Sequence, residues 1–134
     1  MDVQCGHSYY RAFTMTTTKP HHRLAAWQEA MGLVRAVYGV TRNFPMEETY
    51  GLTSQLRRSA VSIPSNVAEG AGRGGRKEFL RFLNIARGSL SELETQLLIA
   101  ADLKYLPMDH GTFALLERVS RLITGLHKML ATQR

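Results

Sequence analysis

Apolar residues recur at helical spacing in four separate segments of the chain. The first segment runs from His22 to about Tyr38, and its apolar residues are Leu24, Trp27, Met31, Val34 and Tyr38. Intervals of three and four place these side chains on one face of an α-helix. Gly39 predicts the end of this helix, and the stretch TRNFP that follows predicts a loop.

The second segment begins near Pro45, because proline is tolerated in the first turn of a helix and Glu47 and Glu48 suit the positive end of the helix dipole. Its apolar stripe is Leu52, Leu56, Ala60, Ile63 and Val67. Pro64 removes one backbone donor, but the stripe resumes in phase after it, which predicts a kink and not an end. Gly70 is then expected to end the helix in the left-handed conformation.

The third segment, from about Arg76 to Leu103, carries the most regular pattern. Its apolar residues form an unbroken heptad seam of Phe79, Leu83, Ala86, Leu90, Leu93, Leu97 and Ala100. Such a seam predicts one helix about 40 Å long. Gly88 and Ser89 in its middle are small enough to let a neighbouring helix approach closely.

The fourth segment, from about Asp109 to Ala131, carries two apolar rows. The first row is Leu116, Val119, Ile123, Leu126 and Leu130, and the second is Leu115, Leu122 and Met129. A bundle helix needs only one row to reach the core. The second row therefore indicates either a wide core face or a subunit interface.

These four segments determine the predicted fold. No segment alternates apolar and polar residues for long enough to form a strand, so the chain is predicted to be all-α. Four helices joined by short loops predict an antiparallel up-down four-helix bundle over residues 20–134. Residues 1–19 show no periodicity and are predicted to form a disordered leader.

Composition places the chain among soluble globular proteins, with 44% hydrophobic and 21% charged residues. No apolar run approaches the roughly 18 residues of a membrane helix, and the N-terminus has no apolar block typical of a secretory signal. We therefore expect a cytoplasmic protein without membrane contact. Cys5 is the single cysteine and the five histidines show no metal-binding spacing, so neither a metal nor a cofactor is expected.

Positive charge is concentrated in one part of the chain. The net charge is +6, and seven basic residues stand against two acidic ones between residues 57 and 87. The basic residues are Arg57, Arg58, Arg73, Arg76, Lys77, Arg81 and Arg87. They form either a solvated face, with Glu69 and Glu78 as local partners, or a surface that binds phosphates of RNA or DNA without strong sequence preference.

The stretch GAGRGGRK, residues 70–77, matches part of two phosphate-binding fingerprints. Both fingerprints need a preceding β-strand, whereas the segment before Gly70 has the pattern of a helix. A Walker loop also needs a lysine and then a Ser or Thr at the positions of Arg76 and Lys77. The glycines therefore predict a turn between two helices and not a nucleotide-binding enzyme.

A polar stripe of Ser59, Ser62, Asn66 and Glu69 accompanies the apolar stripe of the second segment. It fits ordinary solvent exposure. Alternatively, Asn66 and Glu69 satisfy backbone groups freed at Pro64 or pair with arginines at a subunit contact. A catalytic role is disfavoured, because one carboxylate without a neighbouring His, Cys or second acid forms no acid–base pair.

Two stretches of the sequence resemble a known family. FPMEETYGLTSQLRRSAVSIPSNVAEGAGR and KEFLRFLNIARGSLSELETQL are similar to bacterial four-helix bundle proteins first noticed in intervening sequences of 23S rRNA genes. The likeness runs from about Arg23 to Leu130 and is most specific in the motifs SIPSNVAEG and GSLSELETQL. The residues that match the first motif, and that we interpret as structural, are Pro64, Asn66, Glu69 and Gly70.

The resemblance implies an up-down four-helix bundle that assembles as a ring-like homo-oligomer, a pentamer. It implies no enzymatic activity and supplies no catalytic residue. A more distant similarity, to the accessory variability protein of diversity-generating retroelements, implies two kinds of partner, nucleic acid and a reverse transcriptase. Gly74 and Gly75 depart from the family pattern, in which a polar residue is expected to cap the third helix.

Charge and resemblance together predict a non-enzymatic, oligomeric bundle that presents its basic residues to RNA or DNA. The alternative is a protein-interaction scaffold without a nucleic-acid role. The predicted oligomer interface is the row of Leu115, Leu122 and Met129.

Overall fold

The computed structural model describes residues 19–133, which are almost entirely helical. The 3-10 helices are η1 (Pro20–Arg23) and η2 (Met46–Glu48), and the α-helices are α2 (Ala25–Thr41), α3 (Leu52–Gly72), α4 (Arg76–Asp102) and α5 (Gly111–Thr132). No strand occurs among these residues, so the predicted all-α fold with four long helices is confirmed. The predicted leader lies outside the described residues, apart from Lys19.

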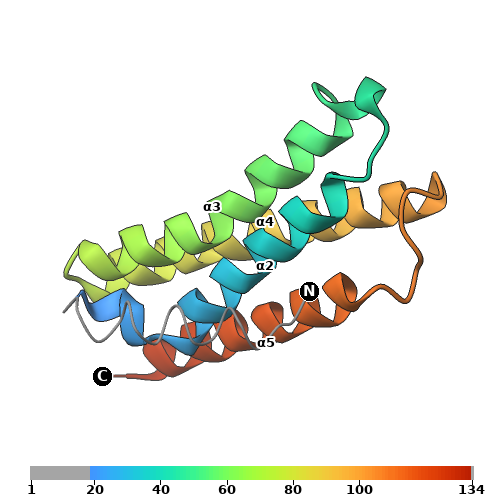
Figure 1. The fold of residues 1–134 in the computed structure, drawn as a ribbon. Coiled ribbons are helices and arrows are strands. Elements are labelled where there is room, and N and C mark those ends of the chain that lie inside the picture. Colours follow the sequence, from blue (N-terminus) through green and yellow to red (C-terminus); the bar gives the residue numbers. More distant parts are fainter. Residues whose placement is uncertain (1–18, 134) are drawn as a thin grey trace.

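The four long helices pack side by side in one bundle (Figure 1). Helix α3 contacts both α2 and α4, and α5 contacts α4 and α2. Ser59 in the first half of α3 bonds to Gln96 in the second half of α4, whereas Gly70 near the end of α3 lies against Phe82 near the start of α4. Helices α3 and α4 therefore run in opposite directions.

One end of the bundle gathers several segments that are far apart in the sequence. Arg76 at the start of α4 donates to the carbonyl of Leu130 near the end of α5, at 3.2 Å. Helix η1 contacts both α2 and α3. Figure 1 shows η1, the α3–α4 turn and the C-terminal end of α5 together on the left. None of the helices formed by residues 19–133 is long and apolar enough to cross a membrane.

Helices α3 and α4 bury the stripes that their sequences predict. All five predicted residues of α3 are buried, and the heptad seam of α4 is buried from Leu83 to Ala100. The start of α3 was predicted wrongly at Pro45. The helix begins at Leu52, because Gly51 has φ −111° and ψ −114°, outside the helical region, and the residues after Pro45 form the separate turn η2.

The first predicted helix needs three corrections. It begins at Ala25 and not at His22, which belongs to η1. Its buried residues are Ala26, Trp27, Ala30, Leu33, Val37 and Thr41. Only Trp27 belongs to the predicted stripe, and the other four predicted residues are half-buried. Helix α2 contacts both α3 and α5, so its buried face is wide and its centre lies between the predicted positions. Gly39 does not end the helix, which continues to Thr41.

Gly70 does not have the predicted capping role. Helix α3 continues through Pro64, as predicted, and then past Gly70 to Gly72. The glycine with a left-handed backbone is Gly74, at φ 77°. Gly70 is instead buried where α3 crosses α4, and a Cβ atom there would lie 2.8 Å from the Cβ atom of Phe82.

The polar stripe of α3 forms part of the contact with α4. Ser59 Oγ donates to Gln96 Oε1 at 2.9 Å, and the hydroxyl oxygens of Ser62 and Ser89 are 2.6 Å apart. Ser59, Ser89 and Gln96 are buried, so solvent exposure is the wrong interpretation for this part of the stripe. We call these four residues the polar seam.

The remaining two stripe residues bond within α3. Asn66 Nδ2 donates to the carbonyl of Ser62 at 2.7 Å, whereas the carbonyl that Pro64 leaves without its helical donor is that of Ala60. Glu69 forms an ion pair with Arg73, one turn further along. Asn66 therefore bonds to the carbonyl of Ser62 and not to the carbonyl of Ala60, which is the one that Pro64 leaves free.

Gly88 and Ser89 differ in their surroundings. Ser89 is buried in the polar seam, as a close helix contact requires. Gly88 is exposed, and a Cβ atom at this position would have no described atom within 4 Å. The prediction of close helix approach therefore holds for Ser89 but not for Gly88 within this chain.

The second apolar row of α5 is divided between core and surface. Leu115 and Leu122 are half-buried and pack against the core. Arg118, on the same side of α5, forms a 3.0 Å ion pair with Glu29 of α2, so this side of α5 faces α2. The wide core face explains Leu115 and Leu122, whereas Met129 is 52% exposed.

Candidate nucleic-acid interface

The end of the bundle that contains the α3–α4 turn is strongly basic. Among the described residues, seven basic side chains lie on the segments that meet there, against the two carboxylates of Glu69 and Glu78. We call these basic residues the basic end: Lys19, Arg23, Arg73, Arg76, Lys77, Arg81 and Lys128. His21, His22 and His127 lie on the same segments.

The opposite end of the bundle has the opposite balance. Its connecting segments and helix ends, within residues 19–133, carry the acids Glu47, Glu48, Asp102 and Asp109 and the basic residues Arg42 and Lys104. The excess of positive charge is therefore larger at the basic end, and an anionic partner is attracted mainly to that end.

Arg73 and Arg81 are held in place by the same aromatic ring. Their guanidinium carbons lie 5.3 Å and 4.7 Å from the ring centroid of Phe82, which the Gly70 contact fixes in turn. Each arginine also pairs with a glutamate of its own helix, Glu69 at 2.9 Å and Glu78 at 3.5 Å.

Arg73 remains fully charged in this arrangement. The hydrogen bond to Glu69, and then its negative charge, raise the pKa of the Arg73 guanidinium further above its usual range. The pairing orders the side chain, but it leaves much of the guanidinium open to solvent. Arg73 can therefore still contact an external anion.

Arg76 has a structural contact across the bundle. Its Nη1 donates to the carbonyls of Leu130 and Gln133, which belong to the last turn of α5 and the residue after it. Carbonyls at the end of a helix have no partner within that helix, so Arg76 caps α5. Lys77 beside it is exposed and has no partner within residues 19–133.

Arg57 and Arg58 lie far from the basic end. They precede Arg73 on α3 by roughly 20 Å along the helix axis. Arg57 donates from Nε to Thr41 Oγ1 at 2.9 Å, and its guanidinium lies 4.4 Å from the centroid of Tyr38. The structure therefore divides the predicted cluster into two separate surfaces and one further residue, Arg87.

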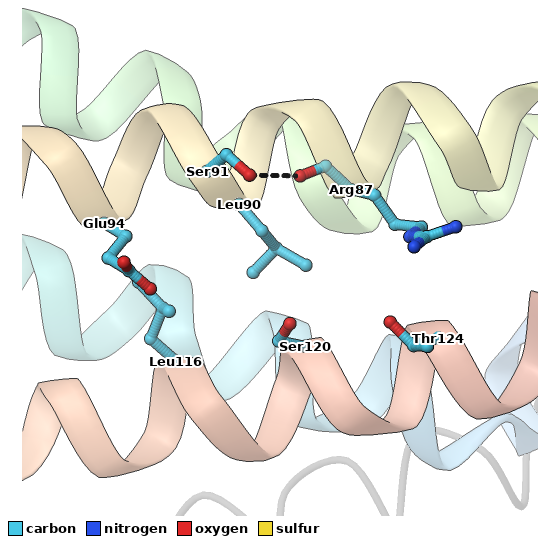
Figure 2. A pocket seen from close by; sticks show the side chains of 7 residues that line it. All are labelled: Arg87, Leu90, Ser91, Glu94, Leu116, Ser120 and Thr124. Atoms are coloured by element: carbon cyan, nitrogen blue, oxygen red, sulfur yellow. Dashed lines mark hydrogen bonds between the residues drawn. The ribbon is translucent and has the colours of Figure 1, made fainter.

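Arg87 lines a small pocket between α4 and α5 (Figure 2). The pocket has a volume of about 160 Å³, with Leu90 and Leu116 in its lining. Figure 2 shows the hydroxyls of Ser120 and Thr124 directed towards α4. Glu94 also lines the pocket, so its negative charge offsets that of Arg87 and the pocket does not extend the basic end.

Sequence reasoning missed Lys19, Arg23 and Lys128. Each lies more than 40 residues from the α3–α4 turn in the sequence, and each is an ordinary exposed residue by itself. The predicted antiparallel bundle contained the missing signal, because in such a bundle the start of the first helix, the second turn and the end of the last helix meet at one end. Applying this rule to the predicted helices would have found Arg23 and Lys128, but not Lys19, which belongs to the predicted leader.

The described residues do not assemble the elements of a metal site. No group of three or more His, Cys, Asp or Glu side chains that could hold a metal ion occurs in the part of the chain that the structure describes. The basic end attracts anions through the charges of its side chains and through the free backbone N–H groups at the start of α4.

One family of known proteins matches the chain. The sequence model of the family described as 23S rRNA-intervening sequence protein matches residues 22–130. The match covers α2, α3 and α4 completely and nearly all of α5, and it includes every residue of the basic end except Lys19. No curated protein matches the chain.

Proposed function

We propose that this chain, which belongs to the family of 23S rRNA-intervening sequence proteins, is a non-enzymatic bundle. In this proposal its basic end binds the phosphate backbone of RNA or DNA. Lys77, Arg73 and Arg81 make the principal phosphate contacts in this proposal. Contacts of this kind give affinity without strong sequence preference.

One observation carries the proposal: η1 with the residue before it, the α3–α4 turn with the start of α4, and the end of α5 meet at one end of the bundle, and together they carry seven basic residues. Like charges gathered on one surface repel one another, and an anionic partner removes that cost. Nucleic acid supplies closely spaced phosphates that match several positive groups at once.

The direct test is fluorescence anisotropy with labelled RNA and DNA of mixed sequence, at low and at near-physiological salt. The diagnostic variant is Arg73→Gln with Lys77→Gln. Arg76 is left intact because it caps α5, and its loss would disturb the fold. We expect about tenfold weaker binding and a salt dependence shallower by about two in slope, because two phosphate contacts disappear.

The matched control is Arg42→Gln with Arg121→Gln. This variant loses the same two charges from exposed positions outside the basic end. Its affinity should stay within about twofold of the parent protein, since non-contacting charges act only through a screened field. Equal losses in the two variants would mean that net charge, and not the basic end, governs binding.

A second candidate function is a homo-oligomeric scaffold for a protein partner. The observation that favours it is the apolar surface that the chain leaves uncovered, with Leu98, Ile99 and Leu103 on the last turns of α4 and Met129 on α5, all at least two-fifths exposed. A ring of copies, a pentamer in the family resemblance, would bury such surface. A reverse transcriptase remains a predicted partner, from the more distant similarity to the accessory variability protein of diversity-generating retroelements.

Salt distinguishes the two candidates. Binding to nucleic acid through the basic end weakens steeply as salt rises, whereas docking of apolar surface changes little. The two functions are compatible in one molecule where docking uses Leu98, Ile99 and Leu103, which lie away from the basic end, whereas Met129 is next to Lys128 of the basic end.

A further inference from the structure

A groove between α2 and α3 carries two tyrosines and two arginines that the basic end does not use. It is an open depression of about 620 Å³ and not an enclosed cavity. Its aromatic and charged lining residues are Tyr38, Tyr50, Arg57 and Arg58. Four hydroxyl-bearing side chains and Val61 complete the lining. We call this depression the Tyr50 groove.

Tyr50 is the most open aromatic side chain among the described residues. It lies in the turn between η2 and α3 and is 97% exposed. A ring in this position contributes almost nothing to the core of this chain. It does offer a flat apolar surface on which another planar group can stack.

The two arginines of the groove differ in mobility. Arg57 is fixed by its hydrogen bond to Thr41 and by its position over the ring of Tyr38. Arg58 is exposed and has no partner within residues 19–133. The groove therefore combines one oriented and one free positive charge with an open aromatic ring.

The acidic residues closest to Tyr50 in the sequence do not line the groove. None of the residues that line it is acidic. Glu47 and Glu48 belong to η2, which precedes Tyr50 in the chain. An anionic chain that enters the groove would therefore run along α3, where Arg57 and Arg58 stand.

We infer that the Tyr50 groove binds an unpaired base of single-stranded RNA or DNA. The base stacks on Tyr50, and Arg57 and Arg58 contact the flanking phosphates. In a duplex the faces of each base are covered by neighbouring base pairs, so only a single strand can offer a base for stacking. The inference rests on the proposed function and adds the class of nucleic acid that is bound.

The groove and the basic end can act on one strand. Arg58 and Arg73 lie roughly 20 Å apart along α3, which is the length of several nucleotides in an extended strand. Phosphates would contact the basic end, while a base near the other end of the strand occupies the Tyr50 groove. Single strands should therefore bind more tightly than duplexes.

The test compares a labelled DNA strand of about twelve thymidines with an abasic strand of the same length, which keeps the phosphates and lacks the bases. A uridine strand provides the RNA arm. The parent protein should bind both base-containing strands about tenfold more tightly than the abasic strand. Tyr50→Ala should abolish this difference, and Tyr50→Phe should retain it, because stacking needs only the ring.

Other results of this comparison would contradict either the inference about the Tyr50 groove or the proposed function. Equal affinity of the parent protein for thymidine and abasic strands overturns the inference and leaves the proposed function intact. Absence of binding to every strand at low salt overturns both. The variant Arg73→Gln with Lys77→Gln should weaken binding to thymidine and abasic strands by the same factor, since it leaves the Tyr50 groove unchanged.

Photo-crosslinking locates the contact directly. In a strand that carries 5-bromouracil, the crosslinked peptide should contain Tyr50, and Tyr50→Ala should lose this product. Crosslinks confined to peptides of the basic end would contradict the inference. Tyr50 makes almost no contact with the fold, so the alanine variant should retain the parental melting temperature.

Discussion

Gly70 of α3 lies directly against Phe82 of α4, so closely that a Cβ atom on Gly70 would stand 2.8 Å from the Cβ atom of Phe82. The contact occurs in the last turn of α3 and brings the two helices together beside the basic end. The same Phe82 ring supports the guanidinium groups of Arg73 and Arg81. One glycine thus links helix packing to the position of two charges.

The first prediction concerns Gly70→Ala. Alanine favours a helix over glycine by about 1 kcal/mol, but the added methyl group meets a Cβ atom that cannot move without the α4 backbone. We expect a net loss of about 1–3 kcal/mol in the free energy of unfolding, measured by urea denaturation. Gly32→Ala in α2 is the control and should stabilise, since no described atom lies within 4 Å of the new methyl group. Stabilisation by Gly70→Ala would show that the helix contact is looser than described.

A second prediction concerns the polar seam. Ser59→Ala leaves the buried Oε1 atom of Gln96 without the donor that it has at 2.9 Å. An unsatisfied buried acceptor costs about 1–3 kcal/mol, so the single variant should be destabilised by that amount. The double variant Ser59→Ala with Gln96→Leu should recover part of the loss. Additive effects of the two changes in a double-mutant cycle would contradict the coupling.

A third prediction separates the two roles of Arg76. Arg76→Gln should increase amide hydrogen exchange in the last turn of α5, because the carbonyls of Leu130 and Gln133 lose their capping donor. The expected loss of stability is about 0.5–1 kcal/mol. Lys77→Gln is the matched control, with the same loss of charge and no capping contact. If amide hydrogen exchange in α5 is unchanged after Arg76→Gln, Arg76 does not cap α5 and contributes only its charge to the basic end.

A fourth prediction concerns pH and His21. Burial, followed by the charges of His22 and Lys19, lowers the pKa of His21 from its usual 6.5. The unfolded chain therefore binds the proton first as the pH falls through 6.5, and stability must decrease in that range. The melting temperature should be lower at pH 5.5 than at pH 7.5, and His21→Gln should reduce the difference.

The ring of His21 lies 5.2 Å from that of Trp27, the single tryptophan, so Trp27 fluorescence provides a local measurement of the same transition. His110→Asn is a suitable control, because it removes a titratable ring at the opposite end and keeps a helix-capping side chain. A pH dependence that is the same in both variants would exclude His21 as its source.

A fifth prediction tests the oligomer. Met129 is exposed in the single chain, so Met129→Gln should leave its fold intact and weaken a subunit contact at that position. Sedimentation velocity should then show a shift to smaller species. Met108→Gln, at an exposed loop position at the other end, is the control and should leave the assembly unchanged. Identical sedimentation of the Met129 variant and the parent protein would remove Met129 from the interface.

The helices themselves were predictable because their signals are local. The α4 seam predicted a helix from Arg76 to Leu103, and the structure has one from Arg76 to Asp102. Boundaries near glycine were less predictable. Gly39 and Gly70 suggested helix ends, but both helices continue past them, since a glycine costs only about 1 kcal/mol in a helix.

The candidate site was predictable only in part. Arg73, Arg76, Lys77 and Arg81 are close in sequence, and they remain together in the structure. Arg57 and Arg58 share the same charged stretch but lie far along α3, because a helix separates residues by a fixed rise. Tyr50 was not selected at all, since an aromatic residue beside a turn has no sequence pattern that reveals its exposure.

Spacing along the chain was enough to predict the fold class, the number of long helices and the faces that α3 and α4 bury, because these depend on the pattern within a single helix. Helix packing was needed to show that Gly70 is a contact residue, that Ser59 is buried against Gln96 and that one end of the bundle is basic. Each of these properties depends on the distance to an atom of another segment, and that distance exists only once the helices have packed.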